Sequence, residues 1–366
     1  MFFNKDINEK SLFKKAFKFY EEGNYPKSLE CYNQILEKNH DNTSALYSKG
    51  VILEIMEQYG ESLKVYNKIL EINPEDKDTL YRMAILFQTL NEYSKALNNY
   101  DTILKLDSNY INAWIGKAEI LNNLKDHSKA LNTLKNAFEI DSNYRNAIEL
   151  KGKIFLDMGK FKESIEIFDK SINIDKDRPI TLTLKGVALL NLQKCSDSIK
   201  CFNKSLKLDP YDYNTWNNKG IALNKLKKFE EAIKCFDKSI ELNPNLSKAW
   251  YNKSISFEAL NNFEEAIKCI DESINIENNN ADAWFAKGNI YYKKNCYPEA
   301  LKYYDNAIKI DPNFAEAWTN KGVIMLQLKK YSEALNYFDK SLEIKPDDES
   351  TLIHKQKLLK ILQKVS

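Results

Sequence analysis

The sequence predicts an all-α fold, a right-handed superhelical solenoid built from antiparallel helix pairs and without β-strands. Three observations support this prediction. The tryptophans repeat with a period of 34 residues, since Trp216, Trp250, Trp284 and Trp318 are evenly spaced and Trp114 lies three periods before Trp216. Two positions of the period hold small residues throughout, and all 8 prolines fall at only three positions of it. A fixed period of this length indicates supersecondary units that stack on one another.

The period divides most of the chain into ten repeats without any insertion or deletion. With tryptophan at position 4, the repeats span 9–42, 43–76, 77–110, 111–144, 145–178, 179–212, 213–246, 247–280, 281–314 and 315–348. Position 8 is Ala, Gly or Ser in every repeat, position 20 is Ala or Ser, and position 24 is always large and apolar.

Each repeat is predicted to form two helices. Apolar residues at positions 4, 8 and 11 share one face of a first helix, and those at 17, 20, 21, 24, 27 and 28 share one face of a second. The break is expected near positions 15–18, where Gly23 and Gly159 supply turn residues. Pro26 and Pro298 suit the first turn of the second helix, and prolines at position 32 end it. Small residues at positions 8 and 20 allow the two helices to approach closely.

The two ends of the chain differ from the repeats. Residues 1–8 are expected to be an N-terminal extension that frays or adds a short turn. Residues 349–366 form an amphipathic segment whose apolar residues include Leu352, Leu358, Leu359 and Leu362. This segment is predicted to be a capping helix, because the last repeat of a solenoid otherwise leaves apolar surface in water.

The pattern resembles the tetratricopeptide repeat (TPR) family, which has W at position 4, G at 8, an aromatic at 17, A at 20, F or Y at 24 and P at 32. Residues 281–314, ADAWFAKGNIYYKKNCYPEALKYYDNAIKIDPNF, match nearly every one of these positions. The chain departs from the family at position 7, where Lys replaces the usual Leu in nine of the ten repeats. These lysines are expected to extend their ammonium groups to solvent or to a carboxylate. Candidate partners at position 25 are Asp169, Asp237, Asp271, Asp305 and Asp339.

Composition argues against several classes of function. The 54 Lys+Arg and 52 Asp+Glu residues give a net charge of +2, whereas a dedicated nucleic-acid binder usually has a strongly basic face. No stretch approaches the roughly 18 apolar residues that cross a bilayer, and the N-terminus lacks a signal-peptide pattern. The 6 cysteines form no C-x-x-C pair and the 3 histidines are scattered, which indicates free thiols in a cytoplasmic protein without a metal site. No catalytic or phosphate-binding motif is present, so neither an enzyme nor a cofactor is expected.

The resemblance implies a scaffold that binds a protein or peptide partner in a groove lined by positions 2, 5, 6, 9, 12 and 13 of the first helices. No repeat has Lys at position 5, so the carboxylate clamp of chaperone-binding TPR domains is absent. Asn218, Asn252 and Asn320 share position 6, where O-GlcNAc transferase repeats carry an asparagine ladder. The proposed C-terminal site consists of Asn218, Asn252, Asn320, Asn289, Tyr251, Phe285 and Tyr292. The alternative is an apolar N-terminal groove containing Phe13, Phe17, Tyr20, Tyr47 and Tyr81.

Two other functions stay open. Self-association through the end repeats or the apolar groove makes the chain a structural homo-oligomer. RNA-binding helical repeats also stack helix pairs, but the six groove positions carry seven basic and nine acidic residues across the chain. A groove with this balance repels phosphate, so nucleic acid is not an expected partner.

Overall fold

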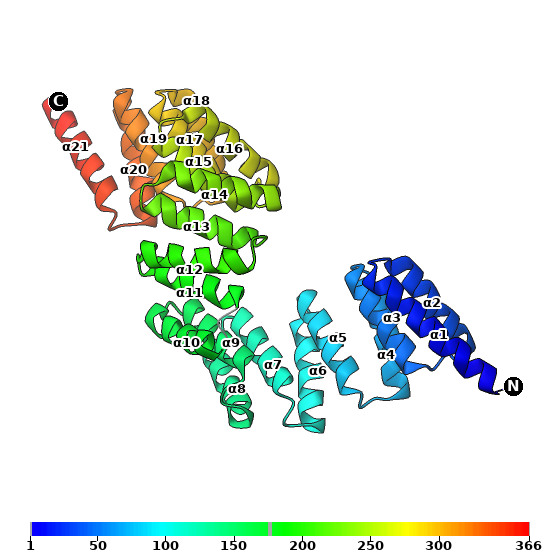
Figure 1. Cartoon of the computed structure of the whole chain (residues 1–366). Coiled ribbons are helices and arrows are strands. Elements are labelled where there is room, and N and C mark those ends of the chain that lie inside the picture. Colours follow the sequence, from blue (N-terminus) through cyan, green and yellow to red (C-terminus); the bar gives the residue numbers. More distant parts are fainter. Residues whose placement is uncertain (1, 175–177, 366) are drawn as a thin grey trace. The chain divides into compact units, whose positions relative to one another are not determined.

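The protein consists of α-helices joined by short turns (Figure 1). The computed structural model describes residues 2–174 and 178–365; the terminal residues 1 and 366, and residues 175–177 at the end of the predicted fifth repeat, lie outside the described residues. Within the described residues there is no strand, and the predicted all-α fold of paired helices is confirmed. The chain divides into an N-terminal body, Met1–Ile174, and a C-terminal body, Asp175–Ser366.

Each repeat contributes two consecutive helices. In the N-terminal body these are α1 (Phe2–Glu21), α2 (Tyr25–Lys38), α3 (Thr43–Ile55), α4 (Tyr59–Ile72), α5 (Lys77–Thr89), α6 (Tyr93–Leu106), α7 (Ile111–Asn123), α8 (His127–Ile140), α9 (Arg145–Asp157) and α10 (Phe161–Ile174). In the C-terminal body they are α11 (Pro179–Asn191), α12 (Cys195–Leu208), α13 (Tyr213–Lys225), α14 (Phe229–Leu242), α15 (Ser247–Ala259), α16 (Phe263–Ile276), α17 (Ala281–Lys293), α18 (Tyr297–Ile310), α19 (Ala315–Gln327) and α20 (Tyr331–Ile344), followed by α21 (Glu349–Val365).

The terminal helices extend beyond the repeats. Helix α1 begins at Phe2, so the backbone there is helical rather than a separate turn. Helix α21 packs on the last repeat through Leu358, which has no exposed area and contacts Met325 and Phe338 in one cluster.

The two helices of a repeat are in closest contact at position 8. A Cβ added to Gly220 would lie 2.5 Å from Cε1 of Phe236, the residue at position 24, and the ring of Phe236 is fully buried. The rings of Phe168, Phe202 and Phe338 crowd their own position-8 glycines in the same way. Each of these glycines therefore makes room for a ring, as the predicted close approach requires.

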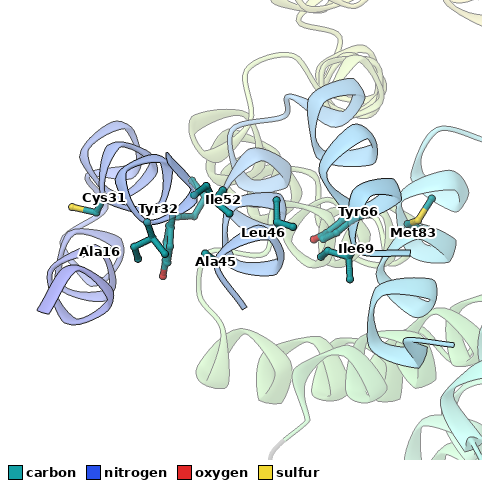
Figure 2. Packing of buried hydrophobic residues seen from close by; sticks show 11 residues of the cluster. Ala16, Cys31, Tyr32, Ala45, Leu46, Ile52, Tyr66, Ile69 and Met83 are labelled. Carbon is teal, nitrogen blue, oxygen red and sulfur yellow. The ribbon is translucent and has the colours of Figure 1, made fainter. Parts of the chain in front are cut away.

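The packed rings also join neighbouring repeats. In the N-terminal body, Tyr32 and Tyr66 from second helices lie in one cluster with Ile52 of α3 and Met83 of α5 (Figure 2). Because the cluster draws side chains from three successive repeats, the core runs continuously through the helices α1 to α5.

Every repeat turns between its helices through a residue with positive φ at position 15. The predicted turn residues Gly23 and Gly159 both have φ of 72°. The equivalent residues of the other repeats are not glycine and have φ between 58° and 62°: Glu57, Asn91, Lys125, Gln193, Lys227, Asn261, Asn295 and Lys329. After Lys227, the N–H of Lys228 donates to the carbonyl of Leu223 at 3.0 Å, which closes the first helix. The turn therefore forms although the left-handed conformation costs a non-glycine residue about 1–2 kcal/mol.

In several repeats the lysine at position 7 forms an ion pair across the junction with the preceding repeat. Nζ of each lysine lies 2.5–2.7 Å from the position-25 carboxylate of the preceding repeat in the pairs Lys117–Asp101, Lys253–Asp237, Lys287–Asp271 and Lys321–Asp305. Lys355 of α21 continues the series with Asp339 at 2.6 Å. The predicted partners Asp237, Asp271, Asp305 and Asp339 are thus found, each on the repeat before its lysine.

Lys287 shows how a cation is held at this position. Burial lowers its pKa, but the hydrogen bond to Asp271 and the charge of that carboxylate outweigh burial and raise the pKa above its ordinary value. The ammonium group also lies 4.4 Å from the ring centroid of Tyr303. The lysine is therefore charged and has replaced the apolar contact that Leu makes in the family.

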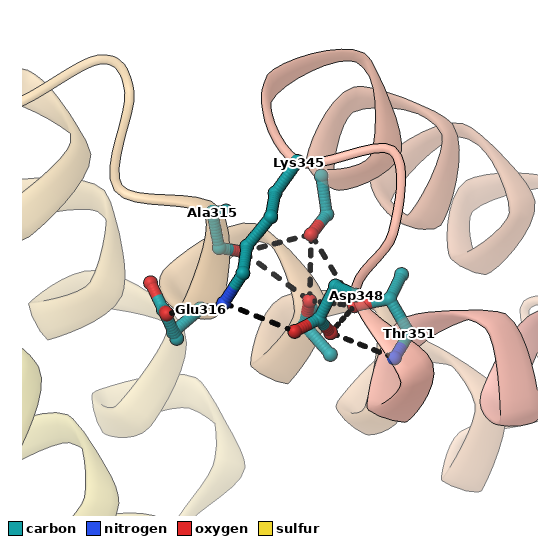
Figure 3. Close-up of polar contacts among 7 residues, drawn as sticks. Ala315, Glu316, Lys345, Asp348 and Thr351 are labelled. Carbon is teal, nitrogen blue, oxygen red and sulfur yellow. Dashed lines mark hydrogen bonds and ion pairs between the residues drawn. The ribbon is translucent and has the colours of Figure 1, made fainter.

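At some junctions, buried hydroxyl groups form hydrogen bonds that join the two helices of one repeat to the first helix of the next. Thr319 of α19 bonds Ser341 of α20 at 2.8 Å and Thr351 of α21 at 2.5 Å, while Thr351 donates to Asp348 at 2.7 Å (Figure 3). Thr183, Ser205 and Thr215 occupy the same repeat positions and form the same contacts, with Asp212 as the acceptor. Position 5, position 27 and position 3 of the next repeat therefore meet at one place.

The contact at position 8 predicts a large difference between two neighbouring substitutions. Gly220→Leu is expected to lower the free energy of unfolding by about 1–3 kcal/mol or more, because the ring of Phe236 fills the space that a side chain needs. Asn218→Leu, at a half-buried position of the same helix, is expected to cost much less. Thermal denaturation followed by circular dichroism measures both, and equal losses would contradict the assignment of positions.

The turn at position 15 predicts a stabilising glycine. Lys227→Gly is expected to raise the free energy of unfolding by up to about 1 kcal/mol, because relief of the left-handed strain exceeds the entropy that glycine adds to the unfolded chain. Lys234→Gly, at an exposed position inside α14, is the matched control and is expected to cost about 1 kcal/mol. Urea unfolding of the two variants gives the comparison, and a loss of stability in both would show that the turn is unstrained.

The ion pairs at the junctions predict an asymmetric response. Asp271→Ala is expected to destabilise the protein by about 1–3 kcal/mol, because it leaves the buried ammonium of Lys287 without its partner. Lys287→Leu is expected to change stability by less than about 1 kcal/mol, since Asp271 is partly exposed and leucine suits the site. Chemical denaturation of both variants and of the double variant tests this, and a larger effect of Lys287→Leu would contradict it.

Candidate functional site

Three residues of the predicted apolar groove line one pocket in the N-terminal body. Phe17 and Tyr20 of α1 and Tyr47 of α3 surround a cavity of about 230 Å³. The remaining lining residues, which with these three define the aromatic pocket, are Tyr32, Ser48, Val51, Ile52 and Arg82. Sequence positions 9, 12 and 5 therefore converge on one site, as expected of the inner face of the first helices.

The wall of the aromatic pocket is unusually exposed for apolar residues. Phe17 is 56% exposed and Tyr20 is 36% exposed, and their rings stack with centroids 6.3 Å apart. Aromatic surface left in water beside a cavity is typical of a binding site rather than of inert surface.

Arg82 closes the other side of the aromatic pocket and is held in place. Its Nε donates to the hydroxyl of Tyr47 at 3.3 Å, and its Nη1 lies 3.6 Å from Oε2 of Glu54. The hydroxyl of Tyr66 donates to the other oxygen of Glu54 at 2.5 Å, and burial, followed by this contact, raises the pKa of Tyr66. The charge of Arg82 is therefore balanced by Glu54, so the pocket has an apolar wall and a neutral, ordered polar end.

A second cavity adjoins the aromatic pocket. It measures about 290 Å³ and is lined by Thr43, Ser44, Tyr47, Ser48, Ile69, Asp76, Asp78 and Thr79, which we call the polar pocket. Tyr47 and Ser48 line both cavities, so the two lie on either side of these α3 residues. The repeat pattern did not predict this pocket, although the two carboxylates Asp76 and Asp78 at the start of α5 are visible in the sequence.

Two residues predicted for the apolar groove lie outside the aromatic pocket. The ring of Phe13 packs edge-on against Tyr32, with centroids 5.8 Å apart, and so belongs to the core. Tyr81 lines a separate cavity of about 440 Å³ together with Tyr100, Ile85 and Glu119.

The predicted C-terminal asparagines are engaged with one another and with neighbouring first helices. Nδ2 of Asn252 donates to Oδ1 of Asn217 at 3.0 Å, and Nδ2 of Asn320 donates to Oδ1 of Asn289 at 2.9 Å. Asn289 also accepts from the hydroxyl of Tyr304 at 2.8 Å. Part of the hydrogen-bonding capacity of these amides therefore joins adjacent repeats, while Asn218 is half-buried on α13.

The predicted C-terminal aromatics are also partly packed. Phe285 contacts Phe314 with ring centroids 4.9 Å apart, and the hydroxyl of Tyr292 accepts from Nε2 of Gln327 at 2.8 Å. Tyr251 packs beside the cluster around Ile270, and burial raises its pKa. Each of these three side chains contributes to packing between helices.

The cysteine side chains are poorly suited to react as thiolates. All six are free, and four of them are buried. Burial raises the pKa of Cys269 to about 11 and also raises that of Cys235. Because the thiolate is the reactive form, these thiols act as apolar packing groups.

The described residues contain no cluster of three or more metal-ligating side chains. None of the helices over residues 2–174 and 178–365 is both long and apolar enough to span a bilayer.

Stacked helix pairs of constant length define a helical-repeat protein, and family models identify which kind. Models described as tetratricopeptide repeat match residues 111–144, 146–178, 213–246, 235–268 and 315–348. A model described as TPR repeat matches 288–329, and one described as Psidin, N-terminal TPR repeats region, matches 13–114. The chain belongs to the tetratricopeptide repeat family.

Solved structures share this fold at low sequence identity. A tetratricopeptide repeat protein from Parabacteroides merdae is 18% identical, with a TM-score of 0.59 over 68% of this chain and 99% of that one. Yeast Tom70 is 16% identical, with a TM-score of 0.52 over 98% of this chain and 97% of that one. Cut9–Hcn1, an APC/C hetero-tetramer, matches at 14% identity and a TM-score of 0.60 over 96% of this chain and 76% of that one. No curated protein sequence matches the chain significantly.

Proposed function

We propose that the chain is a non-enzymatic scaffold of the cytoplasm that binds an extended segment of a partner protein along the inner face of its first helices. The TPR fold is that of a protein-interaction scaffold in general, and no catalytic family is indicated by the matches. The free cysteines support a reducing compartment.

The aromatic pocket carries the proposal. A cavity of about 230 Å³ accommodates one large side chain, and Phe17, Tyr20 and Val51 supply apolar contacts on its wall. Burying a leucine- or phenylalanine-sized side chain there contributes about 1.5–3 kcal/mol. An extended segment with an apolar residue at one position is therefore the ligand that fits this face best.

The C-terminal site, which the sequence put first, becomes the alternative location. Asn218, Asn252 and Asn320 share position 6 of the first helices α13, α15 and α19, and the intervening α17 has alanine there. An amide that donates to a neighbouring repeat still has acceptor capacity for a peptide backbone. The bonds of Asn252 and Asn320 to neighbouring amides favour the N-terminal pocket, because binding at the C-terminal site competes with them.

Substitutions in the aromatic pocket test the proposal. Phe17→Ala combined with Tyr47→Ala is expected to weaken peptide binding at least about tenfold, because both rings lose contact with the bound side chain. The probes are synthetic peptides enriched on the full chain from a random displayed library, and calorimetric titration gives their dissociation constants. Phe17→Ala alone serves as a second variant that leaves the core intact, since Phe17 is 56% exposed.

Two controls give the result its meaning. Tyr211→Ala removes another exposed ring, 76% exposed, and is expected to leave affinity unchanged. The triple variant Asn218→Ala, Asn252→Ala and Asn320→Ala tests the C-terminal site. If only the triple variant weakens binding, the C-terminal alternative is correct; if neither set does, the inner face is not the binding surface. A mass that rises with concentration in the absence of peptide would instead support self-association.

A further inference from the structure

We propose that the polar pocket accepts a lysine or arginine side chain of the bound segment, beside the apolar residue that enters the aromatic pocket. This inference rests on the proposed function and adds the specificity of the site. It follows from an unpartnered hydroxyl, the charge of the pocket walls and the residues that the two cavities share.

Thr79 marks a place where a hydrogen-bonding partner is missing. Its side chain lines the polar pocket and is fully buried, yet its hydroxyl has no hydrogen-bond partner among the described residues. Thr351 and Thr215 occupy the same position 3, and each bonds a threonine at position 5 of the preceding repeat. Thr79 therefore lacks the position-5 hydroxyl that its equivalents bond at these two junctions.

Two substitutions within the repeat pattern remove the hydroxyls that would bond Thr79. Position 5 is Tyr47 where the hydroxyl junctions have Thr319 and Thr183, and position 27 is Ile69 where they have serine. Tyr47 and Ile69 are walls of the polar pocket. At the junction of α3, α4 and α5, Thr79 therefore lacks the hydroxyl partners that Thr215 and Thr351 have, and the polar pocket lies beside it.

The charge of the pocket selects a cation. Asp76 and Asp78 line it, and in the described part of the chain neither forms an ion pair. Asp76 accepts from the N–H of Thr79 at 2.8 Å as the N-cap of α5, and Asp78 accepts from the hydroxyl of Tyr110 at 3.5 Å. Neither bond brings a positive charge to these side chains, and a positively charged donor satisfies two carboxylates better than a neutral one.

The neighbouring cations are already paired elsewhere. Lys77 lies between Asp76 and Asp78 in the sequence. Its Nζ is 2.7 Å from the carboxylate of Asp107, the C-cap residue of α6. Arg82 is paired with Glu54. The pocket therefore keeps an unbalanced negative charge, which a lysine or arginine from the ligand neutralises.

The arrangement also sets the order of side chains in the ligand. Because Tyr47 and Ser48 belong to both cavities, a segment that places an apolar side chain in the aromatic pocket continues directly over the polar pocket. The recognised sequence therefore pairs one apolar residue with one basic residue at a short, fixed spacing.

Charge-neutral substitutions that keep the fold test the proposal. Asp76→Asn retains a side-chain oxygen for the cap of α5, so Asp76→Asn combined with Asp78→Asn removes charge without removing the cap. The probes are a synthetic peptide enriched from the random library on the full chain and its analogue with the basic residue replaced by Met. We expect the double variant to weaken the basic peptide about tenfold or more and to leave the Met analogue unchanged.

Two further variants separate this inference from the proposed function. Asp141→Asn removes one charge from an exposed residue elsewhere in the N-terminal body and is expected to have no effect. Phe17→Ala weakens both peptides if the aromatic pocket binds the apolar residue. If Phe17→Ala weakens binding while the aspartate variants do not, only the basic-residue site is overturned. If Phe17→Ala has no effect, the aromatic pocket does not bind the apolar residue, and the inference about the polar pocket is overturned with it. A library that enriches no basic residue also overturns the inference.

Discussion

The contact between position 8 and the ring at position 24 sets the geometry on which the rest of the structure depends. In a repeat such as 213–246, the ring of Phe236 occupies the space where Gly220 lacks a side chain, so the two helices pack at one fixed separation. This contact and the packing against the next repeat bury the apolar faces of both helices. Phe17, which this packing leaves 56% exposed, lines the aromatic pocket together with Tyr47, whose ring also contacts Tyr66.

The sequence was sufficient for the fold because the period repeats the same packing many times. It was less informative where packing overrides local preference. Gly23 and Gly159 identified the turn between helices, but Lys227 adopts the same left-handed conformation because the helices on either side fix it. Four of the five predicted partners of the lysines are found, whereas Asp101 was not predicted. That Lys287 reaches back to Asp271 of the preceding repeat requires the stacking of repeats.

Residues of the candidate site were predictable where the residue type at one repeat position alone decides whether the side chain lines the pocket. Phe17, Tyr20 and Tyr47 are apolar at groove positions, and they meet in one pocket. Phe13 satisfies the same rule but packs on Tyr32, and the asparagines satisfy their pattern but bond across helices. The polar pocket arises from the combination of Tyr47, Ile69 and Thr79 on three helices, which no single position of the repeat shows.

The ion pairs between repeats bear on how such a chain can lengthen during evolution. Lys287 and Asp305 belong to one repeat, but each pairs with a different neighbour, Asp271 before it and Lys321 after it. A duplicated segment of 34 residues that carries both residues brings a cation for the junction on one side and a carboxylate for the junction on the other. Gene duplication can therefore insert a whole repeat without leaving a buried charge unmatched, and this explains why lysine can persist where leucine is usual in the family.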